Sequence, residues 1–260
     1  MYKPIASQHV IQFIWPLPGA VSQHGSYREA FNLVTHVLGF EGNGSILSYL
    51  RSSNVAEGVS AGYSVRGRGL TMLEVDVSLT THAVENIGLN ESAIIAASAI
   101  FRQLELLKSA LPRMGEGQPL RYLWEDIIRS DVQAYEFDIL DPPRRRTWDS
   151  NPAAQVVDMM TVQRLLLFIV STKVEETWYN AHEPWYNFRY SKSDVPSEWV
   201  SRWHNASAAA PVSLPSRNVY FPANYDVVVK EDDWEGLHAF QPKPMPPPQW
   251  WTNSSELPQN

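Results

Sequence analysis

Two runs of alternating residues on either side of a glycine turn constrain the fold of this chain more than any other feature. Apolar side chains alternate with small or polar ones from Val59 to Val65 and again from Leu73 to Leu79, and Gly67-Arg68-Gly69 lies between the two runs. A period of two places successive side chains on opposite faces of a strand. The segment therefore predicts an antiparallel hairpin with one face in a core and the other in solvent.

Helical periodicity flanks this hairpin. Apolar residues recur at helical spacing from Ser26 to Leu38, glycines then interrupt the pattern, and Gly44-Ser45 can open a second, short helix. After the hairpin, Asn90 is a suitable N-cap for a long helix that Pro112 ends, and Pro119 suits the first turn of a further helix. Helices are thus expected on both sides of the hairpin in the sequence.

Two further segments read as strands. His9 to Trp15 is β-branched and aromatic and alternates poorly, which predicts a strand covered on both faces and closed by Pro16 and Pro18. The apolar hexamer Leu165–Val170 is most simply a central strand, although a helix entrance at the same place is an alternative.

The character of the chain changes after about residue 172, where tryptophan and proline become frequent. A short helix over Pro196–His204 is expected, and residues 242–248, PKPMPPP, must be polyproline-like. The order of the elements predicts an α+β domain over residues 1–172, an antiparallel sheet covered by helices on one face. Residues 173–260 are expected to be a partly extended connector that leads to a following domain.

The composition argues against several classes of protein. A net charge of −7 and a pI near 5.5 argue against a nucleic-acid partner. The chain contains no cysteine, which suits a reducing compartment. The first residues lack the features of a signal peptide, and no apolar run reaches the length of a membrane span, so no membrane association is expected. These observations favour the cytoplasm.

Several motifs in the same order resemble the insulinase/pitrilysin family of zinc metallopeptidases. They match a helix-turn-helix pattern, the end of the long strand, an aromatic hairpin, a short helix and an interdomain sequence, which here are His36–Leu50, Val75–Thr80, Glu183–Tyr190, Val195–Trp203 and Leu214–Tyr225. The resemblance is to the second, non-catalytic domain of an insulysin-like enzyme and the start of its connector to the middle domain. It implies the α/β roll shared by LuxS and insulinase, here incomplete, because the run from Asn151 to Thr172 is shorter than in the family. The last residues resemble the start of the third domain, so a fragment or a truncated relative is expected.

The family's catalytic element is absent from the sequence. In the family, His-x-x-Glu-His and a later Glu hold zinc and activate water. None of the seven histidines here begins this motif, and the nearest string, His82-Ala-Val-Glu85-Asn86, reads as an exposed loop. The resemblance therefore implies no catalytic residue, metal ligand or cofactor in this chain, with zinc in the complete family enzyme, and predicts that the chain alone is inactive.

The resemblance also implies a substrate exosite, where the family adds the amino-terminal end of a peptide to the sheet as an extra strand. Carried over by position, it comprises Gly39, Phe40, Gly42, Val59, Ala61, Gly62 and Tyr63. The family usually has His where Phe40 stands. The alternative is that these glycines only serve a helix end and a close strand approach.

Two functions are therefore expected as rivals. The first is a non-catalytic, peptide-binding chamber wall of an insulysin-like zinc metalloendopeptidase, whose partners are a peptide substrate and a zinc-bearing domain or chain. The second is a degenerate structural or interaction module with no role in proteolysis. The arginines at 66, 68 and 144–146 are interpreted as solvated charges in turns and loops. Within the family, a mitochondrial or peroxisomal location is an alternative to the cytoplasm.

Overall fold

A four-stranded antiparallel sheet lies at the centre of the computed structural model, which describes residues 8–18, 25–66, 69–113, 120–121, 123–124 and 150–216. The strands are β1 (His9–Pro18), β2 (Ala56–Val65), β3 (Leu70–Leu79) and β4 (Leu166–Ser171), and their order is β2-β3-β1-β4. β2 and β3 pair in antiparallel register around the glycine turn. The predicted hairpin is confirmed, although Gly67 and Arg68 of the turn itself lie outside the described residues.

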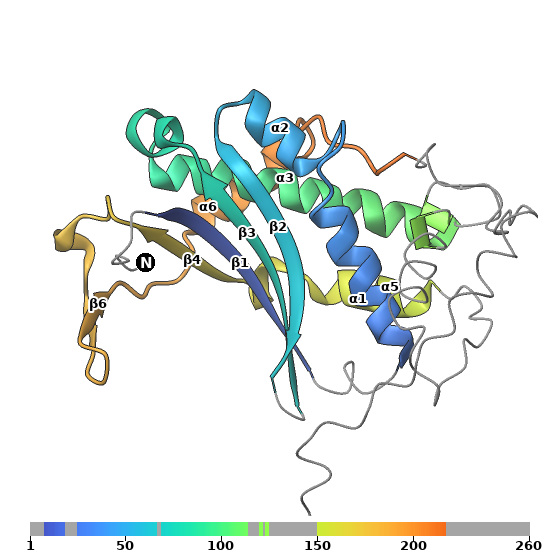
Figure 1. Ribbon diagram of the computed structural model, residues 1–260, viewed down its shortest axis with the longest axis horizontal. Helices are drawn as coiled ribbons and strands as arrows, with labels where there is room; N and C mark the ends of the chain where they lie inside the picture. The colour runs from blue at the N-terminus through green and yellow to red at the C-terminus, as the bar shows by residue number, and fades with distance from the viewer. Residues whose placement is uncertain are drawn as a thin grey trace, which may run out of the picture. The chain divides into compact units, whose positions relative to one another are not determined.

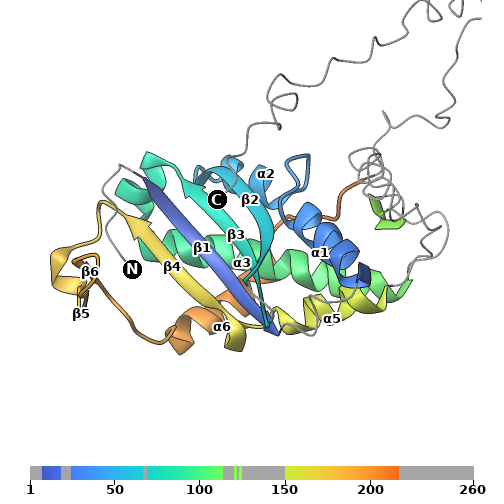
Figure 2. The same ribbon diagram turned by 60° about the horizontal axis from the view of Figure 1, so that its bottom comes forward.

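Helices cover one face of the sheet (Figures 1 and 2). They are α1 (Gly25–Leu38), α2 (Ile46–Ser52), α3 (Leu89–Ala110) and α5 (Asn151–Met159). The side chains that the strands send toward these helices are almost fully buried, and they include Ile11, Phe13, Trp15, Leu17, Leu73, Val75 and Val77. The alternation in the sequence thus produces a core on one side, and the predicted α+β architecture is confirmed.

The opposite face of the sheet, here called the open face, is only partly covered. Val10, Gln12 and Ile14 of β1 are half-buried on this face. The expectation that β1 is covered on both faces is therefore wrong. Poor alternation arises here because apolar side chains lie on the half-buried side as well, so the pattern alone did not reveal which side the helices cover.

The prolines of β1 do not close the strand, which was expected to end at Trp15. Pro16 pairs with Met72 and Pro18 with Leu70. On its other side β1 pairs with β4 only from His9 to Ile14. Proline lacks the N–H that a ladder needs and is tolerated where a strand has no neighbour on that side. The strand therefore continues through both prolines after β4 has ended.

The apolar hexamer at residues 165–170 does form a strand, but β4 is an edge strand and not a central one. In the described part of the sheet its neighbour is β1 alone. Leu166 and Phe168 lie on the open face and are 45% and 38% exposed. A continuous apolar run usually indicates burial on both faces, and that expectation is wrong here because no layer covers this side of β4 in the described residues.

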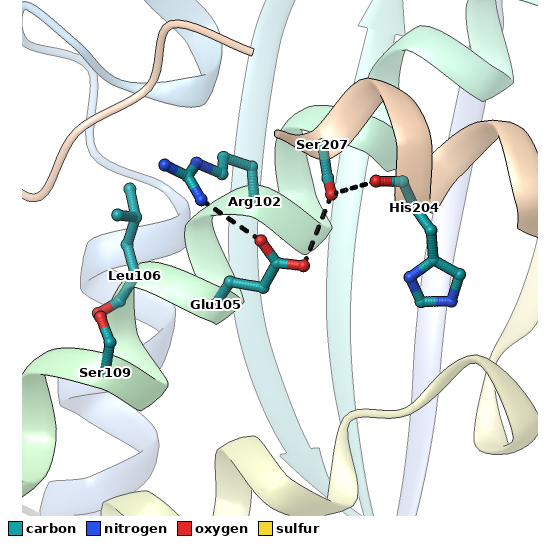
Figure 3. A network of polar contacts seen from close by, with 6 residues as sticks. All are labelled: Arg102, Glu105, Leu106, Ser109, His204 and Ser207. Carbon is teal, nitrogen blue, oxygen red and sulfur yellow. Dashed lines mark hydrogen bonds and ion pairs between the residues drawn. The ribbon is translucent and has the colours of Figure 1, made fainter. Parts of the chain in front are cut away.

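A helix that follows the sheet in sequence returns to pack on α3. This helix, α6 (Ser197–Ser207), confirms the short helix expected over Pro196–His204. Trp203 of α6 is fully buried and stacks on Phe101 of α3 at 5.7 Å between ring centroids. Figure 3 shows the polar contacts beside this stack, in which the Ser207 hydroxyl donates to Glu105 at 3.4 Å and to the His204 carbonyl at 3.0 Å. Part of the predicted connector is thus an integral layer of the domain.

The remaining described elements are short. Strands β5 (Ala181–Glu183) and β6 (Phe188–Tyr190) form a separate two-stranded hairpin. Single helical turns are η2 (Ala83–Ile87), η3 (Leu111–Arg113), η4 (Val162–Arg164) and η5 (Glu176–Trp178). The helix α3 begins at Leu89, with Gly88 rather than the expected Asn90 as its N-cap. Most of the helix expected from Pro119, the arginines at 144–146 and the polyproline segment at 242–248 lie outside the described residues.

Candidate functional site

The outer edge of β2 is the part of the sheet that matches the expected exosite. β2 is the terminal strand of the sheet order, and β3 is its only strand neighbour in the described part of the chain. The Arg66 N–H donates to the Leu70 carbonyl at 2.7 Å, so these two residues form a hydrogen-bonded pair at the end of the hairpin. Hydrogen-bonded pairs alternate along an antiparallel ladder, which fixes the direction of every backbone group in the regular part of β2.

Counting back from Arg66 in the observed register, Ser64, Gly62 and Ser60 direct their backbone N–H and C=O groups toward β3. The residues between them, Val59, Ala61 and Tyr63, direct theirs toward the outer side of the strand. These three residues are the odd-numbered β2 members of the predicted exosite. Their backbone orientation is the one that strand addition requires.

The side chains of these three residues serve the fold. Val59 is 6% exposed and belongs to the hydrophobic core, and Ala61 packs against that core. The ring of Tyr63 stacks on Phe31 of α1 at 4.8 Å between centroids. The outer side of β2 therefore offers main-chain groups, and its side chains are already occupied in packing.

The connection between α1 and α2, residues 39–45, runs beside β2. A methyl group placed on Gly39 would lie 3.2 Å from the backbone nitrogen of Ala61 and 3.2 Å from the Thr35 carbonyl oxygen. Both neighbours are backbone atoms that cannot move aside. Glycine at position 39 therefore permits this close approach and leaves the Ala61 nitrogen uncovered by a side chain.

The other two predicted residues of this connection lie together. A methyl group on Gly42 would meet the ring of Phe40 at 2.4 Å, so the Phe40 ring lies over Gly42. Phe40 also lies near His36, with 6.5 Å between ring centroids. Gly44 has a positive φ of 76°, and its carbonyl accepts from the Ser213 N–H at 2.8 Å. The structure thus brings Gly39 to β2 and pairs Phe40 with Gly42.

Gly62 differs from these glycines because nothing in the described structure crowds it. It is exposed, and a methyl group placed on it would have no atom within 4 Å. Its backbone does not have a positive φ in this strand. The alternative that the exosite glycines only satisfy local geometry accounts for Gly39 and does not account for Gly62.

Two carboxylates on the open face were not among the predicted site residues. Glu74 is the β3 residue opposite Gly62, and Asp76 is opposite Ser60. Ser64 on β2 donates to Glu74 at 3.3 Å, whereas Gln12 on β1 donates to Asp76 at 3.2 Å. The sequence carries a signal for this placement, because a hairpin centred on Arg68 pairs residue 62 with residue 74. That signal becomes useful only once β2 is known to be an edge strand.

The environment of Asp76 disfavours its charged form. Desolvation by burial raises the pKa of the Asp76 carboxyl, the Gln12 amide opposes this by hydrogen bonding, and the charge of Glu74 raises the pKa further. In the described part of the chain, no ion pair involves either Glu74 or Asp76. The open face next to β2 therefore carries two carboxylates that form no ion pair among these residues.

The histidine string that comes nearest to the family's zinc motif lies at η2, which follows β3 in the sequence. His82 is exposed and its ring contacts the Asn86 amide at 3.2 Å, while Glu85 pairs with Lys173 at 3.5 Å. Among the described residues, no group of three or more His, Asp or Glu side chains is placed to hold a metal ion. Nor does any helix among these residues have the length and apolarity that crossing a membrane would require.

Comparison with known proteins places the fold and the motifs in one family. The family model described as the middle or third domain of peptidase M16 matches residues 127–249. The chain is 26% identical over 266 residues to a nardilysin-like protein of Arabidopsis thaliana, covering 95% of this chain and 25% of that protein. It is 23% identical over 224 residues to the human insulin-degrading enzyme, covering 76% of this chain and 20% of the enzyme. The crystal structure of pitrilysin superposes with a TM-score of 0.67 at 19% identity, over 88% of this chain and 25% of that one.

The chain is similar in sequence and in fold to the insulinase/pitrilysin family. It spans about a quarter or less of the length of the curated relatives it matches. The predicted family assignment is thereby confirmed. The family match at residues 127–249 crosses the predicted division at residue 172, and that division stays a prediction.

Proposed function

We propose that this chain is a non-catalytic, peptide-binding wall domain of an insulysin-like zinc metalloendopeptidase. In this proposal an extended peptide pairs with the outer edge of β2, and hydrolysis takes place at a zinc site on another domain or chain. The observation that carries the proposal is the alternation along β2, in which Val59, Ala61 and Tyr63 direct their backbone groups outward.

Three features of the edge support pairing with a peptide. An edge strand presents backbone donors and acceptors in the spacing that another strand matches. Gly39 keeps a side chain away from the Ala61 nitrogen, and Gly62 has empty space above it. Recognition through the main chain is tolerant of sequence, which suits a domain that handles varied short peptides.

The family's activity supports the wider role. Relatives that carry the names insulin-degrading enzyme and nardilysin-like are several times longer than this chain, so the catalytic partner would be a further domain or chain. Zinc would be supplied there. A cytoplasmic location is part of the proposal, and one relative is described as peroxisomal.

Binding of a peptide to the isotopically labelled full chain tests the proposal. A fluorescent peptide of eight residues would be titrated, and amide chemical shifts would be followed by NMR. We expect the largest shifts along β2 at Val59, Ala61 and Tyr63 and along residues 39–45. The control is the same peptide methylated on alternate amides, since loss of two hydrogen bonds would weaken binding by about tenfold or more.

Two methylated peptides serve as controls, one methylated on the odd-numbered amides and the other on the even-numbered amides. Both are needed because a paired strand directs alternate amides toward its partner. Methylation of the amides that face β2 should weaken binding by about tenfold or more, while methylation of the other set should leave binding nearly unchanged. Equal loss with both methylated peptides, or shifts confined to residues remote from β2, would contradict pairing at this edge.

The rival function, an interaction module without a role in proteolysis, is favoured by one observation. Trp185 and Tyr186, in the loop of the β5–β6 hairpin, are 89% and 85% exposed. Exposed aromatic residues of this kind occur at protein interfaces. A folded chain that binds neither the unmodified peptide nor the methylated peptides would support this rival function.

A further inference from the structure

We propose that the β2 edge selects peptides with a lysine or arginine opposite Gly62, and that Glu74 receives the basic side chain across this glycine. The inference rests on the proposed pairing of a peptide with β2 and names the class of peptide that the edge prefers. It follows from the position of Glu74 on β3, directly opposite Gly62, which has no side chain.

The first step concerns the direction of side chains on an added strand. A strand paired with β2 would continue the pleat of the sheet, so its residue opposite Gly62 would project onto the same face as Gly62. Glu74 lies on that face too, on the other side of Gly62 in the observed register. The peptide side chain, Gly62 and Glu74 would thus form one row across three strands.

The second step concerns the space within this row. A side chain at position 62 would stand between the peptide and Glu74, but a methyl group there would find no atom within 4 Å. The neighbouring β2 residues on this face, Ser60 and Ser64, are small as well. The carboxylate is therefore screened from the outer edge of the sheet by nothing larger than a serine side chain.

The third step concerns the direction of the carboxylate. The Ser64 hydroxyl on β2 donates to Glu74 at 3.3 Å, which holds the carboxylate toward β2 and the outer edge. Asp76 is held the other way, by Gln12 on β1 at 3.2 Å. Glu74 is thus the member of the acidic pair that faces an incoming peptide.

The fourth step concerns charge and reach. Neither Glu74 nor Asp76 has an ion-pair partner within the described ranges, so a cation from a ligand would relieve their mutual repulsion. An added strand would lie about 10 Å from β3, twice the ~4.8 Å separation of paired strands. Lysine and arginine carry their charge on long flexible stems that can lie along a surface, which shorter polar side chains cannot match.

Three peptides that differ at one position test this inference on the full chain. The central residue would be lysine, norleucine, which keeps the stem without the charge, or glutamate. Dissociation constants would be measured by fluorescence anisotropy. We expect the lysine peptide to bind about three- to tenfold more tightly than the norleucine peptide, the range for a partly exposed charge pair, and the glutamate peptide to bind most weakly.

Two variants locate the preference. Glu74→Gln should bring the ratio between lysine and norleucine peptides close to one, chiefly by weakening the binding of the lysine peptide. Gly62→Leu should also bring this ratio close to one, because the leucine side chain would stand between the peptide side chain and Glu74. Position 62 has room for a side chain. Glu198→Gln is the matched control because it removes the same charge from α6, which packs against α3; it should leave the ratio unchanged.

The outcomes separate this inference from the proposed function. Equal affinity of the wild-type chain for the lysine and norleucine peptides would overturn the basic preference and leave peptide pairing intact. A lysine preference that persists in Glu74→Gln would also overturn it, because the cation would then be bound elsewhere. If no peptide of the set binds the folded wild-type chain, pairing at β2 fails and the inference fails with it.

Discussion

The indole of Trp203 stacks on the ring of Phe101 at 5.7 Å, and Phe101 in turn meets the edge of Trp15 at 6.3 Å. This aromatic series runs from α6 through α3 to the central strand β1. Trp15 also donates its indole N–H to the Thr161 carbonyl at 3.1 Å. The segment after the sheet is therefore joined to the core by packing, and not merely by chain connectivity.

Removal of the Trp203 ring should destabilise the whole domain. Trp203→Ala leaves a cavity against Phe101, and large aromatic truncations of this kind cost about 3–5 kcal/mol. The free energy of unfolding would be measured by urea denaturation. Trp203→Phe is the control and should lose less stability, because it keeps an aromatic ring stacked on Phe101. The indole N–H that it removes has no hydrogen-bond partner among the described residues. An unchanged midpoint in Trp203→Ala would mean that α6 unfolds separately.

Two glycines should respond oppositely to alanine. Gly39→Ala forces a methyl group to 3.2 Å from two backbone atoms and should cost about 1–3 kcal/mol through overpacking. Gly62→Ala adds a methyl group to empty space and should change stability by less than about 0.5 kcal/mol, or raise it slightly. Thermal denaturation of both variants checks this. Similar losses at both positions would show that Gly62 is also needed for folding.

Thr71→Val should stabilise the protein. Thr71 is fully buried on β3, and its hydroxyl has no hydrogen-bond partner in the portion of the chain that the structure describes. Valine has nearly the same shape, so the exchange removes an unsatisfied polar group at little packing cost and should gain about 1–2 kcal/mol. Chemical denaturation measures the change. Thr71→Ser keeps the hydroxyl and loses the methyl group, and it should be destabilising; a loss in the valine variant would reveal a partner for the hydroxyl.

Asp76→Asn should stabilise the chain at neutral pH and not in acid. The pKa of Asp76 is raised above its ordinary value of 3.8 in the folded protein by burial and by Glu74, against the hydrogen bond from Gln12. Between these two pKa values the folded state binds more protons than the unfolded state, so the wild type loses stability as the pH rises through that window. Asparagine keeps the acceptor for Gln12 without the charge.

The measurement for Asp76→Asn is the free energy of unfolding as a function of pH for both proteins. The gain of the variant should be constant above the raised pKa and should shrink as the pH falls through it toward 3.8. A gain that persists unchanged in acid would mean that the effect of the substitution is not electrostatic.

The hairpin was predictable because both of its strands alternate and its turn contains glycines, so local pattern and tertiary structure agree. The position of β4 was not. Six consecutive apolar residues predict a strand, but whether that strand has one neighbour or two depends on which other segments reach the sheet. The exposure of Leu166 and Phe168 shows that the run is more apolar than its place in the described sheet requires.

The site was predictable in part for a similar reason. The family motif led to Val59, Ala61 and Tyr63, and the register then showed that their backbone groups face outward. Glu74 and Asp76 read as ordinary solvent-facing residues of an alternating strand. Their relation to Gly62 depends on pairing across the hairpin and on the edge position of β2, and the second of these is not encoded in local sequence.

Both backbone groups of Ser213 are hydrogen-bonded. Its N–H donates to the Gly44 carbonyl at 2.8 Å, and its carbonyl accepts from the Gln103 side chain at 3.1 Å. Gly44 belongs to the same short connection as Gly39, which rests against Ala61. A tension applied to the chain at residue 216 would therefore load the Gln103–Ser213 bond and then the Ser213–Gly44 bond. Either that bond breaks, or the loop moves with it and the spacing between Gly39 and the β2 backbone changes. The domain thus has a short mechanical link between its outgoing chain and the strand edge.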